Sequence, residues 1–337
     1  MGAGKSNLGC GGKEHQRSLQ QTGDMRGAAM RVLITGGSGF IGTHVAHALL
    51  EHGHDVCIYD LQPTSLSKVK YVQGDILDEQ QLLSALQNRD AVVHLAAQVS
   101  VPESLRSPKK THEINVIGTQ NVIDCCEKAN IRRVVIASSA AVYGDLESVP
   151  LSEESVGTLL SPYAHSKAEN EQQILRANER GFEAVALRFF NVYGPNQNPT
   201  GAYSAVIPSM LKCLVNGQQP VVYGDGMQTR DFIHAHDVSA CILKLLSSQW
   251  NEISSHVYNV ATSQQISILD LLSSLNAACI DYGVLEQSCA PVFKPAREGD
   301  IRHSVADISR IKHELGWMPT IDFDDGIREL VKLWSRE

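Results

Sequence analysis

The sequence predicts an α/β fold in which a doubly wound parallel sheet is joined to a smaller C-terminal domain. From Met30 to about Gly194, apolar runs of strand length alternate with runs of helix length. The apolar runs carry few polar residues, as is typical of strands buried on both faces of a parallel sheet. After Gly194 the alternation gives way to longer loops. We therefore expect the second domain to be interleaved with the last elements of the sheet.

Each element follows from a local pattern. The segment 42–54 has apolar residues at helical spacing (Val45, Ala48 and Leu49) and reaches a glycine at Gly53, which predicts a helix that ends there. Further helices are expected at 78–88, 111–130 and 161–181. Strands are expected at 31–36, 55–60, 69–75, 91–97, 132–139 and 182–194, with one more at 255–261.

Composition excludes several classes of protein. The 337 residues carry a net charge of −8 and contain no long basic run, so nucleic acid is not an expected partner. No apolar run reaches the ~18 residues that a membrane span needs. Residues 1–29 are polar, rich in Gly and Gln and without a period, which predicts a disordered tail.

Cysteine and histidine spacing predicts no metal site. The eight cysteines form no CxxC pair and no zinc-like pattern with histidine. We therefore expect free thiols in the reducing cytoplasm. His234 and His236 are two residues apart. This spacing suits one face of a strand, and we interpret both histidines as structural.

The stretch "TGGSGFIG" lies between the first predicted strand and the first predicted helix. Gly36 allows a tight turn, Gly39 lets the backbone approach a pyrophosphate, and Gly42 lets the helix pack on the strand. The free N–H groups of the helix would then face the phosphates. Asp60 ends the second strand, 24 residues after Gly36, where a carboxylate can accept from both ribose hydroxyls and would repel a 2′-phosphate. The pattern predicts a Rossmann domain that binds NAD rather than NADP.

These observations divide the chain. The predicted NAD-binding Rossmann domain comprises residues 30–193 plus about 232–262. The predicted substrate-binding domain, or cap, comprises 194–231 plus about 263–337, and residues 1–29 form the tail.

The stretch "SPYAHSK" places Tyr163 and Lys167 one helical turn apart, on the same helix face. A tyrosine that acts as a base near neutrality must lose about 3 pKa units. A neighbouring ammonium group and a positively charged nicotinamide ring are the natural sources of that change. A strand end with two hydroxyls, Ser138 and Ser139, comes about 25 residues earlier. A hydroxyl at the carboxyl edge of the sheet can donate to an oxygen whose charge changes during hydride transfer.

These motifs give the chain a clear family resemblance. Residues 30 to about 320 resemble the extended short-chain dehydrogenase/reductase family, and within it the nucleotide-sugar epimerases. The resemblance implies that Tyr163 is the base, Lys167 its partner, and Ser139 the hydroxyl donor, since Ser139 stands four residues before Tyr143. The matching stretches are "TGGSGFIG", "HLAAQ", "INVIGT", "ASSAAVYG", "SPYAHSK", "LRFFNVYGP", "GDGMQTRDFIH" and "REGDIRHSVAD".

The resemblance also implies the binding residues. Asp75 and Ile76 would flank the adenine, and Asn115 would lie near the active-site pocket. The cofactor-binding set implied is Gly36, Gly39, Phe40, Ile41, Gly42, Asp60, Asp75, Ile76, Leu95, Ala96, Ala97, Tyr163, Lys167 and Phe190. The substrate-binding set is Ser139, Asn191, Val206, Tyr223, Arg230, Arg297, Asp300 and Ser304. Within it the two arginines would clamp the diphosphate, because a bidentate guanidinium suits phosphate. Asn191 would contact the diphosphate or sugar, Asp300 a ribose hydroxyl and Tyr223 the uracil.

The sequence leaves three functions to be compared. By resemblance, 4,6-dehydratases carry an Asp-Glu pair after the catalytic hydroxyl, and related decarboxylases keep a glutamate there; here Ala140 and Ala141 stand at those positions. The sequence therefore favours an NAD-dependent UDP-sugar 4-epimerase that works through a transient 4-keto sugar, whose loosely held ring turns over before hydride returns. A non-catalytic nucleotide-sugar sensor is the third reading, which the presence of both Tyr163 and Lys167 disfavours.

Finer specificity stays open. Ser304 stands where relatives restricted to galactose can carry a tyrosine, and the loop around 198–208 resembles that of epimerases for N-acetylated sugars. UDP-Glc/UDP-Gal and UDP-GlcNAc/UDP-GalNAc therefore both remain as substrate pairs. Gln98 and Val99 occupy the loop where well-known epimerases hold a lysine near the cofactor, which predicts weaker cofactor retention. The resemblance also implies a homodimer, built by packing the "NVIGTQ" and "SPYAHSK" helices of two subunits into a four-helix bundle.

Overall fold

The computed structural model describes residues 28–146, 148–155, 157–198, 205–250, 253–297 and 299–335. The predicted tail therefore lies outside the described residues, apart from its last two positions. Part of the loop around 198–208, from 199 to 204, lies outside them as well. Among the helices that the structure describes, none is long and apolar enough to cross a membrane.

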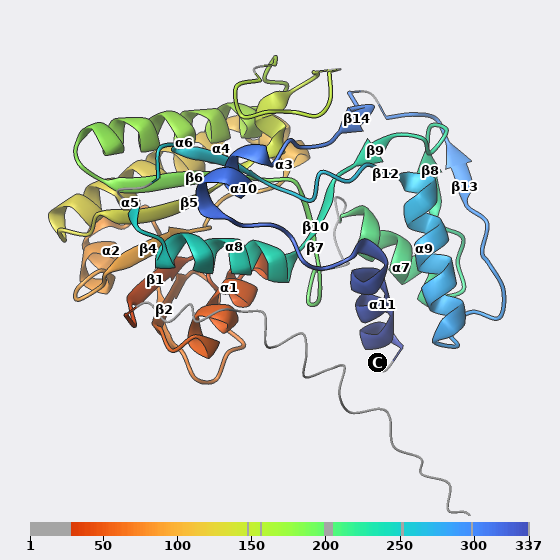
Figure 1. Ribbon diagram of the computed structural model, residues 1–337, viewed down its shortest axis with the longest axis horizontal. Helices are drawn as coiled ribbons and strands as arrows, with labels where there is room; N and C mark the ends of the chain where they lie inside the picture. The colour runs from red at the N-terminus through yellow and green to blue at the C-terminus, as the bar shows by residue number, and fades with distance from the viewer. Residues whose placement is uncertain are drawn as a thin grey trace, which may run out of the picture.

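A parallel sheet of seven strands forms the centre of the larger half of the molecule (Figure 1). Its order is β11-β6-β5-β4-β1-β2-β3, and each neighbouring pair is parallel. The strands are β1 (Arg31–Thr35), β2 (Asp55–Asp60), β3 (Lys70–Gln73), β4 (Ala91–His94), β5 (Arg133–Ser139), β6 (Glu183–Phe189) and β11 (Val257–Val260). The doubly wound Rossmann sheet predicted from the sequence is confirmed.

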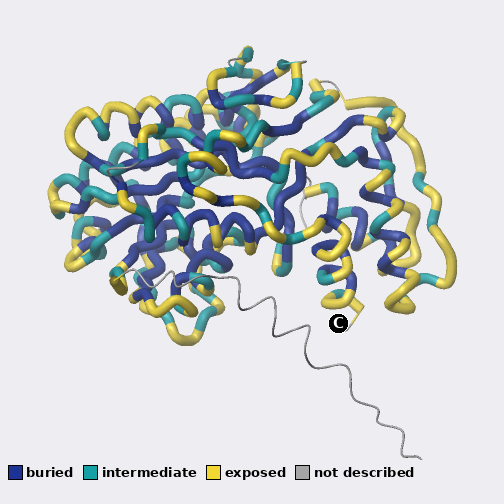
Figure 2. Tube along the Cα trace, viewed as in Figure 1, coloured by how far each residue is buried: buried dark blue, intermediate teal, exposed yellow. Residues whose placement is uncertain are grey.

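Helices cover both faces of this sheet, and alternate strand residues pack against each layer. On β1, Val32 and Ile34 join the core under α1 (Phe40–Glu51) and α8 (Ala235–Ser247), whereas Leu33 joins the core on the other side. That second side is covered by α2 (Glu79–Ala85), α5 (Gly118–Lys128) and α6 (Pro162–Glu179). Figure 2 shows the strands as the most continuously buried part of the chain. This burial on both faces explains the solidly apolar strand sequences.

Side-chain caps begin several of these helices where the sequence predicts a start. Ser161 accepts a hydrogen bond from the N–H of Ala164, and Pro162 occupies the first turn of α6. Asp78 caps α2 through the N–H of Gln81. The helix predicted at 111–130 is longer and composite. It runs through α4 (Pro108–His112), a π-helical segment (Glu113–Ile117) and α5, with α3 (Val101–Arg106) before it.

The cap has an apolar core of its own. That core joins α7 (Val206–Val215), α9 (Ile268–Asp281) and α11 (Phe323–Trp334). Short strands complete the cap and its junction with the sheet half: β7 (Asn191–Tyr193) with β10 (Phe232–His234), β8 (Val221–Tyr223) with β13 (Val292–Lys294), and β9 (Thr229–Arg230) between β12 (Ile266–Ser267) and β14 (His303–Ser304).

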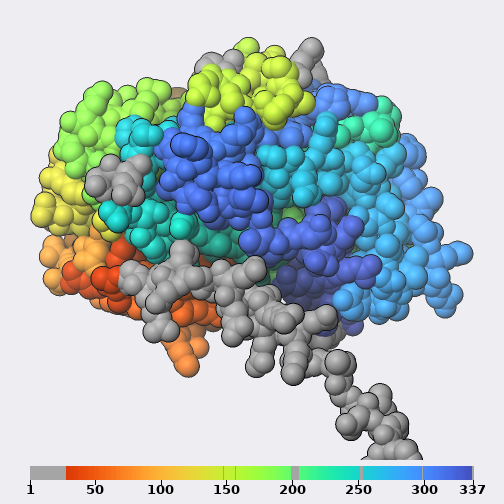
Figure 3. All heavy atoms as spheres, in the orientation of Figure 1, coloured from red at the N-terminus to blue at the C-terminus, as the bar shows by residue number. Residues whose placement is uncertain are grey.

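The division into two domains at the residues given above stays a prediction. One segment assigned to the cap packs on the sheet half: Ile311 and Leu315 of α10 (Ser309–Leu315) belong to the same core as α1 and α8. Figure 3 shows this C-terminal stretch, in blue, lying over the sheet half beside α8. The chain therefore returns to the first half before it ends in α11.

Candidate active site

The glycine turn after β1 has the close packing that its sequence predicts. Gly36 has a φ of +70°, and a Cβ built there would lie 2.5 Å from the backbone N of Ala96. A Cβ on Gly42 would lie 2.3 Å from the carbonyl oxygen of Gly36, so only glycine lets α1 approach the turn. Gly39 is the N-cap residue of α1. Its Cβ would meet one atom at 3.2 Å, which leaves the backbone open on that side.

A cavity of about 740 Å³ opens over this turn at the carboxyl ends of the strands. Its wall includes every residue of the predicted cofactor set: Gly36, Gly39, Phe40, Ile41, Gly42, Asp60, Asp75, Ile76, Leu95, Ala96, Ala97, Tyr163, Lys167 and Phe190. Ser139 of the predicted substrate set lines it too. Residues from six strand ends, those of β1 to β6, thus meet around one volume. We call it the dinucleotide cavity.

Backbone N–H groups hold the Asp60 carboxylate at the end of β2. Its Oδ2 accepts from the N–H of Ser38 at 3.0 Å, and its Oδ1 accepts from the N–H of Gln62 at 2.9 Å. Asp75 is fixed in a similar way, since its Oδ1 accepts from the N–H of Leu77 at 3.0 Å. Two fixed carboxylates at one end of the cavity suit the hydroxyls and amines of an adenosine and disfavour a 2′-phosphate.

Tyr163, Lys167 and Ser139 meet at the inner wall of the cavity. Tyr163 is 9% exposed, and its phenol lies close enough to the hydroxyl of Ser139 for that hydroxyl to lower its pKa. The Nζ of Lys167 lies 5.9 Å from the centre of the Tyr163 ring and donates to the carbonyl oxygen of Ala137 at 2.8 Å. The family resemblance predicts this group of three, and the fold brings it together.

The electrostatics of the group differ from the sequence-based expectation. Burial raises the pKa of Tyr163, and the nearby hydroxyl of Ser139 acts in the opposite direction and lowers it. Burial also lowers the pKa of Lys167 to about 8, against the opposing charge of Glu171. In the protein without its cofactor the net shift of the Tyr163 pKa is therefore upward, and the lowering expected from Lys167 together with the nicotinamide ring stays a prediction. The free-energy cost of removing a phenolate from water exceeds the stabilisation that the neighbouring groups supply.

A second cavity of about 510 Å³ lies between the sheet half and the cap. Val192 and Gln197 line both cavities, so the two adjoin. Six of the predicted substrate residues line the second cavity: Asn191, Val206, Tyr223, Arg230, Arg297 and Asp300. Ser304 lines neither cavity. It is buried in β14, where it is the register partner of Arg230.

A buried carboxylate holds the strand that carries Arg230. Asp231 accepts from the N–H groups of Thr262, Ser263 and Ala306 and from the Thr262 hydroxyl, at 2.7–3.2 Å. Burial raises the pKa of Asp231 to about 6. Four hydrogen bonds from two other segments thus fix the backbone next to Arg230.

The charged groups of the second cavity are paired with one another. The Nη2 of Arg230 donates to the Oδ1 of Asp300 at 2.5 Å. The guanidinium of Arg297 lies 3.9 Å above the ring centre of Tyr223, and it lowers the pKa of that phenol. Both predicted clamp arginines therefore contact other members of the predicted substrate set.

Gln197 and Lys110 were not predicted at the site, whereas Asn115 was expected near the pocket without a stated role. Gln197 lines both cavities, and Lys110 of α4 lines the dinucleotide cavity with Gln98 and Val99. Asn115 does not line the cavity but fixes its rim. Its Oδ1 accepts from the N–H of Gln98 at 2.7 Å and its Nδ2 donates to the Gln98 carbonyl at 3.0 Å. No spacing rule finds such residues, because the fold alone brings them to the rim.

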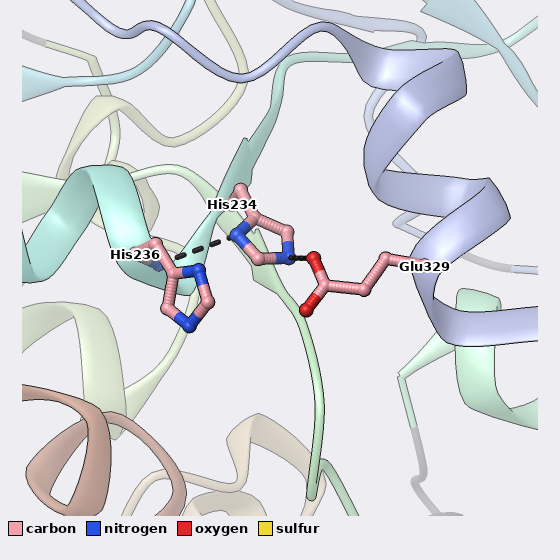
Figure 4. Close-up of side chains that lie close together, drawn as sticks. All are labelled: His234, His236 and Glu329. Atoms are coloured by element: carbon pink, nitrogen blue, oxygen red, sulfur yellow. Dashed lines mark hydrogen bonds and ion pairs between the residues drawn. The ribbon is translucent and has the colours of Figure 1, made fainter. Parts of the chain in front are cut away.

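Two histidines lie elsewhere than expected (Figure 4). β10 ends at His234, and His236 belongs to α8, so they do not share a strand face. The N–H of His236 donates to Nδ1 of His234, which places the proton of the neutral ring on Nε2. That nitrogen lies 3.5 Å from Oε2 of Glu329 on α11, without hydrogen-bond alignment.

Burial lowers the pKa of His234 to about 3, so the ring stays neutral. The ligand atoms of His234, His236 and Glu329 all lie within 4.8 Å of one another. A metal ion would require an unprotonated Nε2, however, and would displace the hydrogen bond from the His236 N–H. The geometry favours a structural contact between α11 and the β10–α8 junction, and the absence of a metal site stays a prediction.

Comparisons with known proteins agree with this geometry. The sheet is parallel, has a glycine turn after its first strand, and carries a Ser, a Tyr and a Lys at its carboxyl edge. This combination is typical of nucleotide-binding enzymes of the short-chain dehydrogenase/reductase type. Residues 32–261 match the family model of the NAD dependent epimerase/dehydratase family. The chain belongs to this family.

Relatives within the family are UDP-sugar epimerases. The chain is 33% identical to the UDP-glucose 4-epimerase of Azospirillum brasilense over 93% of its own length and 94% of the relative's. It also resembles the solved UDP-N-acetylglucosamine 4-epimerase of Methanobrevibacter ruminantium, in complex with UDP-N-acetylmuramic acid. There the TM-score is 0.83 and the identity 33%, covering 92% of this chain and 99% of that one. The UDP-glucose 4-epimerase of Thermus thermophilus in complex with NAD gives a TM-score of 0.79 at 30% identity, covering 90% and 98%.

Proposed function

We propose that this chain is an NAD-dependent 4-epimerase of UDP-sugars. The observation that carries the proposal is the pair formed by the Ser139 hydroxyl and the Tyr163 phenol. It lies in the dinucleotide cavity, which adjoins a second cavity with two arginines. A sugar held from the cap by its nucleotide diphosphate can therefore reach the acid–base pair.

The dinucleotide cavity fits NAD. The glycine turn leaves room for a diphosphate beside the first turn of α1, and Asp60 is placed to accept from ribose hydroxyls. We propose that Asp75 and Ile76 flank the adenine, that Leu95, Ala96 and Ala97 border the middle of the cofactor, and that Lys167 holds the nicotinamide ribose. NAD, when bound, accepts a hydride from C4 of the sugar and returns it.

The residues of the chain then move one proton. Tyr163 takes the proton of the sugar 4-hydroxyl and later returns it, so it serves as base in one direction and as acid in the other. In the protein alone, the Ser139 hydroxyl lies beside the phenol and favours the ionised form of Tyr163. When a sugar is bound, the single proton of this hydroxyl is donated to the same sugar oxygen instead.

The cap grips the nucleotide rather than the sugar. Arg230 and Arg297 bind the diphosphate, Asp300 a ribose hydroxyl, and Tyr223 the uracil. Asn191 and Val206 border the substrate. Strong binding at the diphosphate combined with weak binding at the sugar lets the ring present either face to the same base. To bind, both arginines must exchange their present partners, Asp300 and Tyr223, for phosphate.

The side chains beside Ser139 disfavour the alternatives of dehydration and decarboxylation. Ala140 and Ala141 begin the 3-10 turn that follows Ser139 (Ala140–Tyr143), and neither can move a second proton. Among the described residues that line the two cavities, the carboxylates are Asp60, Asp75 and Asp300, which we assign to nucleotide binding.

The proposal is tested by incubating the purified protein with UDP-Glc, UDP-Gal, UDP-GlcNAc and UDP-GalNAc and following C4 configuration by NMR. We expect each active sugar to reach the same equilibrium from either epimer. A 4-keto-6-deoxy product would contradict epimerisation and support a dehydratase. Bound NAD without turnover of any of the four sugars would support the nucleotide-sensing alternative. The same assay decides between the plain and acetylated pairs. Ser304 lines neither cavity, and its expected effect on sugar size stays a prediction.

We also propose a homodimer in which α5 and α6 of two subunits form a four-helix bundle. Exposed apolar side chains on this side of the molecule, Ile117 and Leu175, support it. Sedimentation should give twice the chain mass, and charged substitutions at these two positions should halve it. A cytoplasmic location belongs to the same proposal. It is supported by the seven described cysteines, which are all free thiols.

A further inference from the structure

Three consecutive residues at the end of β5 each contact α6, at positions one helical turn apart. The carbonyl of Ala137 accepts from Lys167 at 2.8 Å, and the hydroxyl of Ser139 acts on the phenol of Tyr163, whose pKa it lowers. Between them, the hydroxyl of Ser138 donates to Oε1 of Glu171 at 2.5 Å. The proposed chemistry uses the first and third of these contacts and gives no role to Glu171.

Glu171 ties two strands to the helix. The Nε of Arg188 donates to its Oε1 at 2.8 Å, and the Nη2 of Arg188 donates to its Oε2 at 2.7 Å. Arg188 lies on β6 as the register partner of Ser138 on β5. Glu171, Arg188 and Ser138 are all buried, with exposures of 6%, 9% and 3%. One carboxylate thus accepts three hydrogen bonds at the strand ends that carry the site.

The surroundings of Lys167 make this carboxylate electrostatically important. The groups that face Lys167 are Tyr163 and Glu171 on α6, His94 on β4, and the carbonyl of Ala137 on β5. Burial keeps His94 neutral by lowering its pKa to about 3. Arg188 faces Glu171 from β6. Among the described residues, Glu171 is therefore the anionic side chain that acts on Lys167. Its charge raises the pKa of Lys167, whereas burial lowers that pKa.

We propose that Glu171 is a positioning residue of the active site: it keeps the Lys167 ammonium protonated and, through Ser138 and Arg188, holds the end of β5 where Ser139 meets Tyr163. This inference rests on the proposed epimerase function. It assigns to a buried ion pair a role in setting the charge of the site, beyond packing α6 on the sheet.

The direct test measures the protonation of Lys167 rather than turnover. Protein labelled with ¹³C at lysine Cε is titrated by NMR, and the Lys167 resonance is assigned by its loss in Lys167→Arg. In Glu171→Gln the titration midpoint of Lys167 should fall by about 1 pH unit or more, the scale on which a close opposite charge acts. The matched control is Glu169→Gln on the same helix, where the half-exposed carboxylate pairs with Arg176. It should leave the midpoint unchanged.

Activity adds a second measurement. The alkaline limb of the kcat–pH profile should move to lower pH in Glu171→Gln, because Lys167 then loses its proton earlier. Glu171→Asp keeps the charge and should restore the midpoint, with kcat still reduced because the shorter side chain cannot reach both strands. A structural role alone would change stability without moving either pH value.

The outcomes separate the two proposals. If wild-type protein epimerises no UDP-sugar, the proposed function fails while the NMR midpoints still test the role of Glu171. Equal Lys167 midpoints in wild type, Glu171→Gln and Glu169→Gln overturn the inference whatever the activity. If Glu171→Gln does not fold, Glu171→Gln/Arg188→Met replaces it, because that double variant does not leave the Arg188 guanidinium buried without its carboxylate. Its Lys167 midpoint should also fall, and an unchanged midpoint counts against the inference.

Discussion

The two adjoining cavities are built in different ways. The backbone shapes the dinucleotide cavity, with a glycine turn that no other residue can replace and carboxylates held by backbone N–H groups. Side chains dominate the second cavity, which we call the cap cavity. Its arginines are already paired, Arg230 with Asp300 and Arg297 with the ring of Tyr223.

The contrast suits the two proposed ligands. A cofactor that stays bound through many turnovers benefits from a rigid, preformed site, since little ordering remains to be done on binding. A substrate must enter and leave in each cycle. Side chains that exchange an internal partner for a phosphate can bind it firmly without holding it permanently. We therefore expect substitutions in the two halves to separate cofactor retention from substrate affinity.

The largest effect is expected where the two cavities meet. Tyr163→Phe removes the proton carrier and should lower kcat by roughly 10²–10⁴-fold, the usual contribution of a general acid–base group. NAD should remain bound, because the ring still fills the same wall. Epimerisation by NMR and the absorbance of the bound dinucleotide measure the two quantities on one sample. Loss of both together would mean that Tyr163 acts by shaping the cavity.

An effect confined to the cap is expected from Arg230→Gln. A hydrogen bond to a charged partner contributes about 1.5–3 kcal/mol, so KM for the UDP-sugar should rise by about 10–100-fold. NAD binding should not change. Arg302→Gln is the control, because Arg302 forms an exposed ion pair with Asp225 on the same side of the molecule. Equal effects of the two substitutions on KM would contradict the proposed role of Arg230 in binding the diphosphate.

The cofactor half can be divided further with two glycines of one motif. Gly42→Ala should lower the free energy of unfolding by about 1–3 kcal/mol, because its Cβ would meet the Gly36 carbonyl at 2.3 Å. Gly39→Ala, with a nearest contact of 3.2 Å, should cost little stability and weaken NAD binding instead. Thermal melts with and without NAD distinguish these results. The reverse order would contradict the assignment of the phosphate side of the turn.

The smallest expected effect is on pH dependence. The pKa of Lys167 lies at about 8 because burial lowers it. The ammonium form is complete below this pH and is lost as the pH rises through it, so kcat should fall to about half near pH 8. A kcat that stays constant up to pH 10 would show that the charge of Lys167 does not limit the reaction.

The sequence predicted the cofactor half more completely than the cap. Its motifs are local: the glycine turn, Asp60 and the Tyr163–Lys167 pair each lie within one element or at one junction. Buried parallel strands also carry a strong apolar signal. The residues assigned to the cofactor from the family's short sequence motifs therefore all line one cavity.

What the sequence missed depends on contacts between distant segments. Gln197 and Lys110 reach the cavities only through the fold, and Asn115 turns out to fix the rim at Gln98. Ser304 was expected at the sugar but lies buried beside Arg230. The upward shift of the Tyr163 pKa in the protein alone has a related cause. Spacing reveals that Lys167 is one turn away, but not how much water both side chains lose.

The measurement that tests the account most directly follows a deuterium atom at C4 of the UDP-sugar. If Tyr163 moves only the hydroxyl proton, the label should remain at C4 while NMR shows both epimers forming, and none should appear in water. Loss of the label to solvent during interconversion would mean that carbon-bound hydrogen is removed as a proton, which would contradict the account.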